Sequence, residues 1–237
     1  MIPYIIINGK SSKNINGLMI QSLPPITKPK IRTSVEEFDG RDGDIVSVLG
    51  YGAYDKTITI GLKGDYDVDE VISFLQQEGK ITFSNELDKY YYFSQYDTID
   101  FEKLIRFKTA NVNFHIQPFK HSLDEQPLKW TNPGNKTICT FSVRNRGNLK
   151  SKPKITIEGT GEINVYIGIE NILQIALTNE TIIIDAEKMN AYSQTGEYMN
   201  RKVIGEYRNL RLPSGVSDLR VTGNLQSVKV ENYSLWI

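Results

Sequence analysis

Two pairs of carboxylates are spaced closely enough to suggest acid–base chemistry. Asp97 lies three residues before Asp100, and Asp185 lies two residues before Glu187. Two carboxyl groups that flank a glycosidic bond are sufficient for glycoside hydrolysis. Neither pair belongs to a motif, and Asp185 ends an apolar run, where an acidic residue commonly opens a turn. Since P-loop, GxSxG, HExxH and dinucleotide-binding patterns are also missing, we expect no enzyme, no catalytic residue and no cofactor.

The single cysteine and the two histidines were weighed as nucleophile, base or metal ligands. Cys139 lies inside the alternating run ICTFSV, which shares one face among Cys139, Phe141 and Val143 and excludes an internal disulfide. His115 and His121 lie in strand-like or linker sequence with no motif around them. A buried strand thiol is therefore favoured over a catalytic cysteine.

The stretch DGRDGD has the composition of a calcium-binding loop. An EF-hand loop needs oxygen ligands at positions one, three and five. Counting from Asp39 places Arg41 and Gly43 at positions three and five, and counting from Asp42 places Val46 at position five. Both registers fail, so a tight glycine-rich turn is favoured and no metal site is expected.

The stretch KYYYFSQY, from Lys89 to Tyr96, could stack sugars or bases on flat rings. In a strand, however, Tyr91 and Phe93 face one way while Tyr90 and Tyr92 face the other. Aromatic residues on both faces suit a strand that is covered twice, by the core and by a helix or a neighbouring subunit. We therefore favour packing over a ligand platform, and we predict that Tyr91 and Phe93 contribute to an oligomer interface.

The basic stretch FSVRNRGNLKSKPKITIEG, from Phe141 to Gly159, could be a phosphate or sugar loop. Alternating residues flank it on both sides, and Pro153 is suited to the start of a strand because proline cannot donate to a ladder. The Lys150–Lys154 cluster is short and single. We interpret the stretch as strand, turn, connection and strand, with a solvated basic rim.

Bulk properties describe a globular chain without a nucleic-acid footprint. Of 237 residues, 39% are hydrophobic and 24% are charged, and the net charge is zero. A balanced charge argues against nucleic-acid binding. Apolar runs are strand-sized and the N-terminus does not read as a signal peptide, so we expect folding in a cytoplasm and no membrane insertion.

The elements that position these residues are predicted to be mainly β-strands. Period-two alternation recurs between Gly, Asn, Asp and Pro turns, which is typical of sandwiches and barrels. One segment departs from this: apolar residues spaced i, i+3, i+4 and i+7 predict a helix over 67–78. A polar stretch with two prolines predicts two domains, 1–121 and 122–237.

In order along the chain, several motifs resemble distal tail proteins of siphophages. The first half carries Asn8-Gly9, GLMIQSLPP, the DGRDGD turn, the helix DVDEVISFL and ITFSN, and the second half carries NRGNLKSKPKITIEG, IIIDAE, a polar stretch around Asn200, NLRLPSG and a closing strand with Trp236. The resemblance implies an N-terminal β-sandwich or barrel-like domain with one α-helix that forms a ring. It also implies a C-terminal β-sandwich similar to galectins and carbohydrate-binding modules.

What the resemblance implies about function is structural. It implies a virion protein at the distal end of a phage tail, assembled in the host bacterial cytoplasm into a hexamer, as one ring or two stacked rings. Its implied partners are the tail tube protein and the tail-associated hub or tail-tip protein, with DNA passing only as cargo. A chain of this length leaves no room for the inserted carbohydrate-binding module or arm of some relatives. The alternative is an adhesion module that binds host-surface polysaccharide.

Overall fold

The chain forms two compact units. The computed structural model describes residues 2–40, 42–94, 99 and 101–237. Contacts between Cα atoms group the chain up to Leu123, with Ile237, into a first unit and Asp124–Trp236 into a second unit. The predicted boundary after residue 121 stays a prediction of independent domains, because a grouping of contacts does not show that either unit folds alone.

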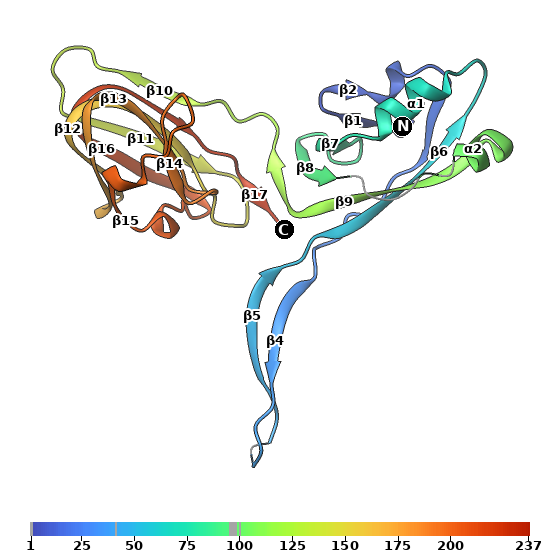
Figure 1. The fold of residues 1–237 in the computed structure, drawn as a ribbon, viewed down its shortest axis with the longest axis horizontal. Coiled ribbons are helices and arrows are strands. Elements are labelled where there is room, and N and C mark those ends of the chain that lie inside the picture. Colours follow the sequence, from blue (N-terminus) through green and yellow to red (C-terminus); the bar gives the residue numbers. More distant parts are fainter. Residues whose placement is uncertain (1, 41, 95–98, 100) are drawn as a thin grey trace. The chain divides into compact units, whose positions relative to one another are not determined.

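The first unit is built on one antiparallel sheet that curls into half of a barrel (Figure 1). The sheet order is β2-β1-β7-β8-β9-β6-β3, and β4 pairs only with β5 in a separate two-stranded ribbon. The strands are β1 (Ile5–Ile7), β2 (Lys10–Ser11), β3 (Leu18–Ser22), β4 (Ile31–Glu36), β5 (Ile45–Tyr51), β6 (Tyr54–Leu62), β7 (Gly79–Phe83), β8 (Lys89–Ser94) and β9 (Thr109–Ser122).

Two helices complete the first unit. Helix α1 (Val68–Leu75) confirms the helix predicted from periodicity; its N-cap Asp67 accepts hydrogen bonds from the backbone N–H groups of the first turn. Val71, Phe74 and Leu75 enter the core of the sheet. Helix α2 (Phe101–Phe107) was not predicted, so the expectation of one helix is wrong. Seven residues are too few to establish a 3.6-residue period, and the signal is correspondingly weak.

The second unit is a sheet of long, bent strands around its own core. Its order is β10-β16-β12-β13-β14, with β11 paired to β16 and β15 paired to β13. The strands are β10 (Leu128–Thr131), β11 (Ile138–Asn145), β12 (Lys154–Ile167), β13 (Glu170–Asp185), β14 (Asn190–Tyr192), β15 (Val203–Gly205), β16 (Gly215–Glu231) and β17 (Leu235–Trp236). The predicted fold class, mainly β, is confirmed for the chain.

The long strands bend where their pairing register shifts. The pairing of β12 with β16 shifts between Thr160 and Asn164, and Gly223 adopts a φ of 136° at this point. A Cβ at Gly223 would lie 2.6 Å from the Glu162 carbonyl oxygen, so only glycine fits. These bulges let the sheet fold back on itself and enclose alternating Val, Ile and Leu side chains.

The stretch that resembled a phosphate loop is a structural seam. Asn145 is 2% exposed, and its amide nitrogen donates to the carbonyl oxygens of Leu149 at 2.7 Å and Leu212 at 3.0 Å. Its side-chain oxygen accepts from the Gly147 N–H at 2.9 Å. Pro153 lies just before β12, as predicted. Asn145 therefore fastens the β11–β12 connection to a distant segment of the chain, and its hydrogen-bonding groups are occupied by that role.

Candidate functional site

The ribbon formed by β4, β5 and the turn between them has one apolar face. Antiparallel partners share a face, and Val35 is opposite Val46 while Thr33 is opposite Val48. The opposite face carries polar partners such as Ser34 and Ser47. We define the apolar ribbon face by Ile31, Thr33, Val35, Val46, Val48 and Tyr51.

This apolar ribbon face is open to solvent in the single chain. Val35 is 53% exposed, Val46 is 58% exposed and Val48 is 69% exposed. An isolated two-stranded ribbon is at best marginally stable in water, and clustered exposed apolar side chains mark interaction sites. Figure 1 shows the ribbon extending away from the sheet of the first unit. The arrangement is suited to burial against another surface.

The base of the ribbon is anchored to the first unit by polar contacts. Segment 23–27 leads from β3 toward β4, and its Pro25 carbonyl accepts from Lys56 Nζ at 2.8 Å. The neighbouring Pro24 carbonyl accepts from the Asn85 amide at 3.3 Å. Lys56 is 3% exposed, and burial lowers the pKa of its ammonium group. On the β5 side, the Tyr51 ring meets the Phe119 ring edge-on at 5.4 Å.

Tyr91 and Phe93, predicted to face a neighbouring subunit, lie in the core of the first unit. Tyr91 is 0% exposed and Phe93 is 4% exposed. The Tyr91 hydroxyl donates to Glu86 at 2.9 Å, and Glu86 also accepts from buried Lys120 at 2.7 Å. Burial and the Glu86 carboxylate raise the pKa of Tyr91. A charged residue at either predicted position would disturb folding, so these two residues are unsuitable probes of an interface.

The candidate acidic residues are separated by the structure. Asp185 accepts hydrogen bonds from the backbone N–H groups of Glu187 at 3.1 Å and Lys188 at 3.0 Å, so it opens a turn as expected. Asp97 and Asp100 lie outside the described residues. Gly40 and Gly43 adopt positive φ in the turn of the ribbon, as a glycine-rich turn requires.

Cys139 is buried in β11 and should be chemically silent. It is 2% exposed, and burial raises the pKa of its thiol to about 11. At pH 8 about one thiol in a thousand would be ionised, and only the thiolate attacks. We expect an Ellman-type reagent to leave the native protein unmodified and to modify one thiol per chain in denaturant. Rapid reaction of the native protein would contradict this placement.

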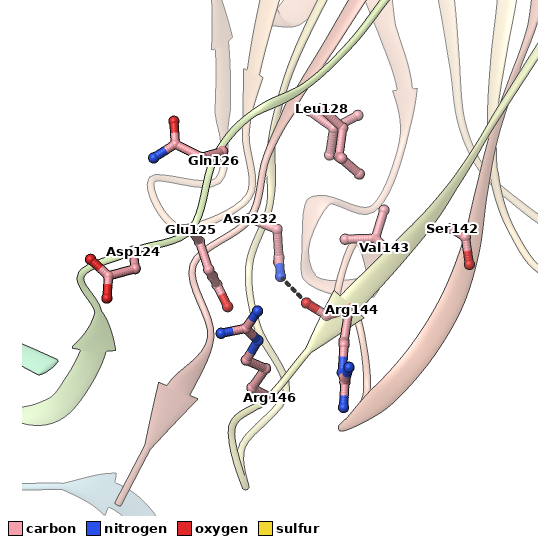
Figure 2. A pocket seen from close by; sticks show the side chains of 10 residues that line it. Asp124, Glu125, Gln126, Leu128, Ser142, Val143, Arg144, Arg146 and Asn232 are labelled. Atoms are coloured by element: carbon pink, nitrogen blue, oxygen red, sulfur yellow. Dashed lines mark hydrogen bonds between the residues drawn. The ribbon is translucent and has the colours of Figure 1, made fainter. Parts of the chain in front are cut away.

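A pocket of about 320 Å³ in the second unit is the best candidate for a small ligand. Figure 2 shows Glu125, Arg144, Arg146 and Asn232 around it, with Leu128 on the apolar side. Charged and amide groups beside an aliphatic side chain can bind a polyhydroxylated ligand. The Glu125 carboxylate already accepts from the backbone N–H of Ser234 at 2.6 Å. One of the pocket's two carboxylates is thus engaged in structure.

Comparison with solved structures identifies the fold. The chain is similar to the crystal structure of SPP1 Dit protein, described as a paradigm of the hub adsorption apparatus in phages that infect Gram-positive bacteria, with a TM-score of 0.65 and 15% identity over 100% of both chains. It is also similar to a chain of the phage P2 baseplate in its activated conformation with Ca, with a TM-score of 0.52 and 11% identity over 99% of this chain and 98% of that one.

No family model and no curated protein matches the chain. At these identities the similarity establishes the fold alone, over the full length of the chain. The resemblance to distal tail proteins drawn from ordered sequence motifs is confirmed at that level. No helix of the described residues is long and apolar enough to span a membrane.

The ribbon was not identified from the sequence as a site. Its strands alternate apolar and polar residues in the same way as strands of the core. Period two indicates that one face is apolar, but it does not tell whether that face meets the chain's own core or another molecule. The one available signal was the acidic, glycine-rich stretch between the two strands.

Proposed function

We propose that the protein is a non-enzymatic structural component of a long-tailed phage virion. In this proposal six copies form a ring at the distal end of the tail, and the ring joins the tail tube to tail-tip or baseplate proteins. The full-length similarity to SPP1 Dit supports the proposal at the level of fold. The observation that carries the assembly is the exposed apolar ribbon face, which a single chain leaves uncovered.

The ring acts through surface burial. Stable interfaces bury roughly 1,200–2,000 Å² of surface and have a core enriched in apolar residues. Identical contacts repeated around a closed rotation axis produce a ring with a central opening. The tail tube protein would bind one face of the ring and the hub protein the other, while DNA passes through the opening. Assembly takes place in the host cytoplasm before the protein enters the virion.

Negative-stain imaging of the purified protein tests this proposal. Class averages should show a six-fold ring with a central opening, either single or stacked in pairs. Antibody labelling of intact virions should place the protein at the tail end opposite the head. Rings of another symmetry would contradict the hexamer, and labelling at the head or along the tube would contradict the position.

The alternative is an adhesion module that binds host polysaccharide through the pocket of the second unit. A glycan array that includes cell-wall polysaccharides tests it with the full-length protein. Binding that disappears in the Arg144→Ala, Arg146→Ala variant would favour the alternative. A blank array together with rings in the electron microscope would favour the structural role. A reducing-sugar assay on the same polysaccharides separates both functions from glycoside hydrolysis.

A further inference from the structure

A groove with apolar walls follows the edge strand β3 of the first unit. Strand β3 lies at the end of the sheet order, so its outer side has no neighbouring strand. The groove has a volume of about 220 Å³. Ile2 is 78% exposed and Met19 is 40% exposed beside it. We define the β3 groove by Ile2, Pro3, Lys13, Leu18, Met19 and Ile20.

Lysines lie along this groove. Lys13 lines it, with its ammonium group 3.7 Å from the centre of the Tyr4 ring. A second, more open hollow shares Lys13, Leu18 and Met19 with the groove and continues to Lys63, with Asp65 as its acidic residue. The groove and hollow together thus form a surface of apolar residues with two lysines and one carboxylate.

The turn of the ribbon carries the opposite charge. Between Glu36 and Asp44 the sequence EEFDGRDGD contains five acidic residues and one basic residue. All five carboxylate side chains are exposed, and none forms an ion pair among the described residues. The ribbon therefore combines an apolar face with an acidic end, while the β3 groove combines apolar walls with lysines.

We propose that the ribbon of one copy binds the β3 groove of the next copy around the ring. The apolar ribbon face covers Ile2 and Met19, and the acidic turn approaches Lys13 and Lys63. A ring of identical copies requires two different complementary surfaces on each copy, and these two surfaces match in polarity and charge. Figure 1 shows the ribbon extending away from the end of the sheet that holds its own N-terminus. The inference rests on the proposed ring and identifies its subunit contact.

Charge reversal with rescue tests the contact in the full-length protein. The Lys13→Glu, Lys63→Glu variant and the Glu36→Lys, Glu37→Lys variant should each raise the concentration at which half of the rings dissociate by at least about tenfold at low salt. The chain that carries all four changes should recover assembly, because the charges again attract. The defect of each double variant should shrink as salt increases, since screening weakens repulsion between exposed charges.

The control and the contrary outcomes separate this inference from the proposed function. The Lys150→Glu, Lys188→Glu variant makes the same change of charge on exposed lysines of the second unit and should assemble like the unmodified protein. Unmodified protein that forms rings while both double variants assemble equally well would overturn the contact and leave the ring in place. Failure of the four-fold variant to recover would also overturn it. An unmodified protein that never assembles would reject the ring and the contact together.

Discussion

Replacement of both Val35 and Val46 with glutamate is expected to convert the ring to monomers of 27.0 kDa. The two valines are opposite each other on the apolar ribbon face and are more than half exposed in the single chain. Burying a valine side chain stabilises a contact by roughly 1.5 kcal/mol or more, and the new carboxylates would add a cost of desolvation. Because a six-membered ring repeats the contact six times, the loss accumulates over the assembly. Light scattering after gel filtration measures it.

A matched control uses the other face of the same ribbon. Ser34 and Ser47 are also opposite each other, one residue away from each valine, and their side chains lie on the polar face. The Ser34→Glu, Ser47→Glu variant should keep the mass of the unmodified protein. Circular dichroism of all variants should be unchanged, since the ribbon does not contribute to the core of the first unit. Equal masses for the valine variant and the unmodified ring would remove the ribbon from the interface.

The Asn145→Asp variant is expected to lose roughly 3 kcal/mol or more in the stability of the second unit at neutral pH. The change preserves size and keeps an acceptor for the Gly147 N–H. It removes both amide donors from the carbonyl oxygens of Leu149 and Leu212, and it places a buried carboxylate against them. For a unit of this size the loss corresponds to a fall of about 10–15 °C in melting temperature, which calorimetry would measure.

The pH dependence of this defect gives a second check. Burial and the two carbonyls would raise the pKa of the new carboxyl group above its unfolded value, since both disfavour the charged form. The folded variant is then relatively stable below that unfolded pKa, near 3.9, and loses stability as pH rises through the folded pKa. The difference from the unmodified protein should therefore be smaller at pH 4 than at pH 7. Asn224→Asp is the matched control, because Asn224 is exposed in β16. Equal losses in both variants would contradict the role of Asn145.

Local chemistry could be predicted where one residue decides the backbone. Asp67 and the apolar stripe after it predicted α1, and Pro153 predicted the start of β12. The burial of Cys139, Phe141 and Val143 on one face of β11 followed from alternation alone. In each case the determining interactions lie within a few residues along the chain, so the sequence contains them.

Tertiary relations could not be predicted in the same way. The two faces of β8 were assigned correctly as sets, but nothing in KYYYFS indicates that Tyr91 and Phe93 turn toward the core. That choice depends on Glu86 and Lys120, which meet the Tyr91 hydroxyl from other parts of the chain. The ribbon was missed for the same reason, because its strands differ from core strands only in what surrounds them.

The solution mass of the purified, unmodified protein tests the central proposal most directly. Light scattering should give about 162 kDa (6 × 27.0 kDa) for one ring or about 324 kDa (12 × 27.0 kDa) for two stacked rings. The mass should be constant across the elution peak, as expected for a closed assembly. A mass of 27.0 kDa at every concentration up to the limit of solubility would contradict self-assembly through the ribbon.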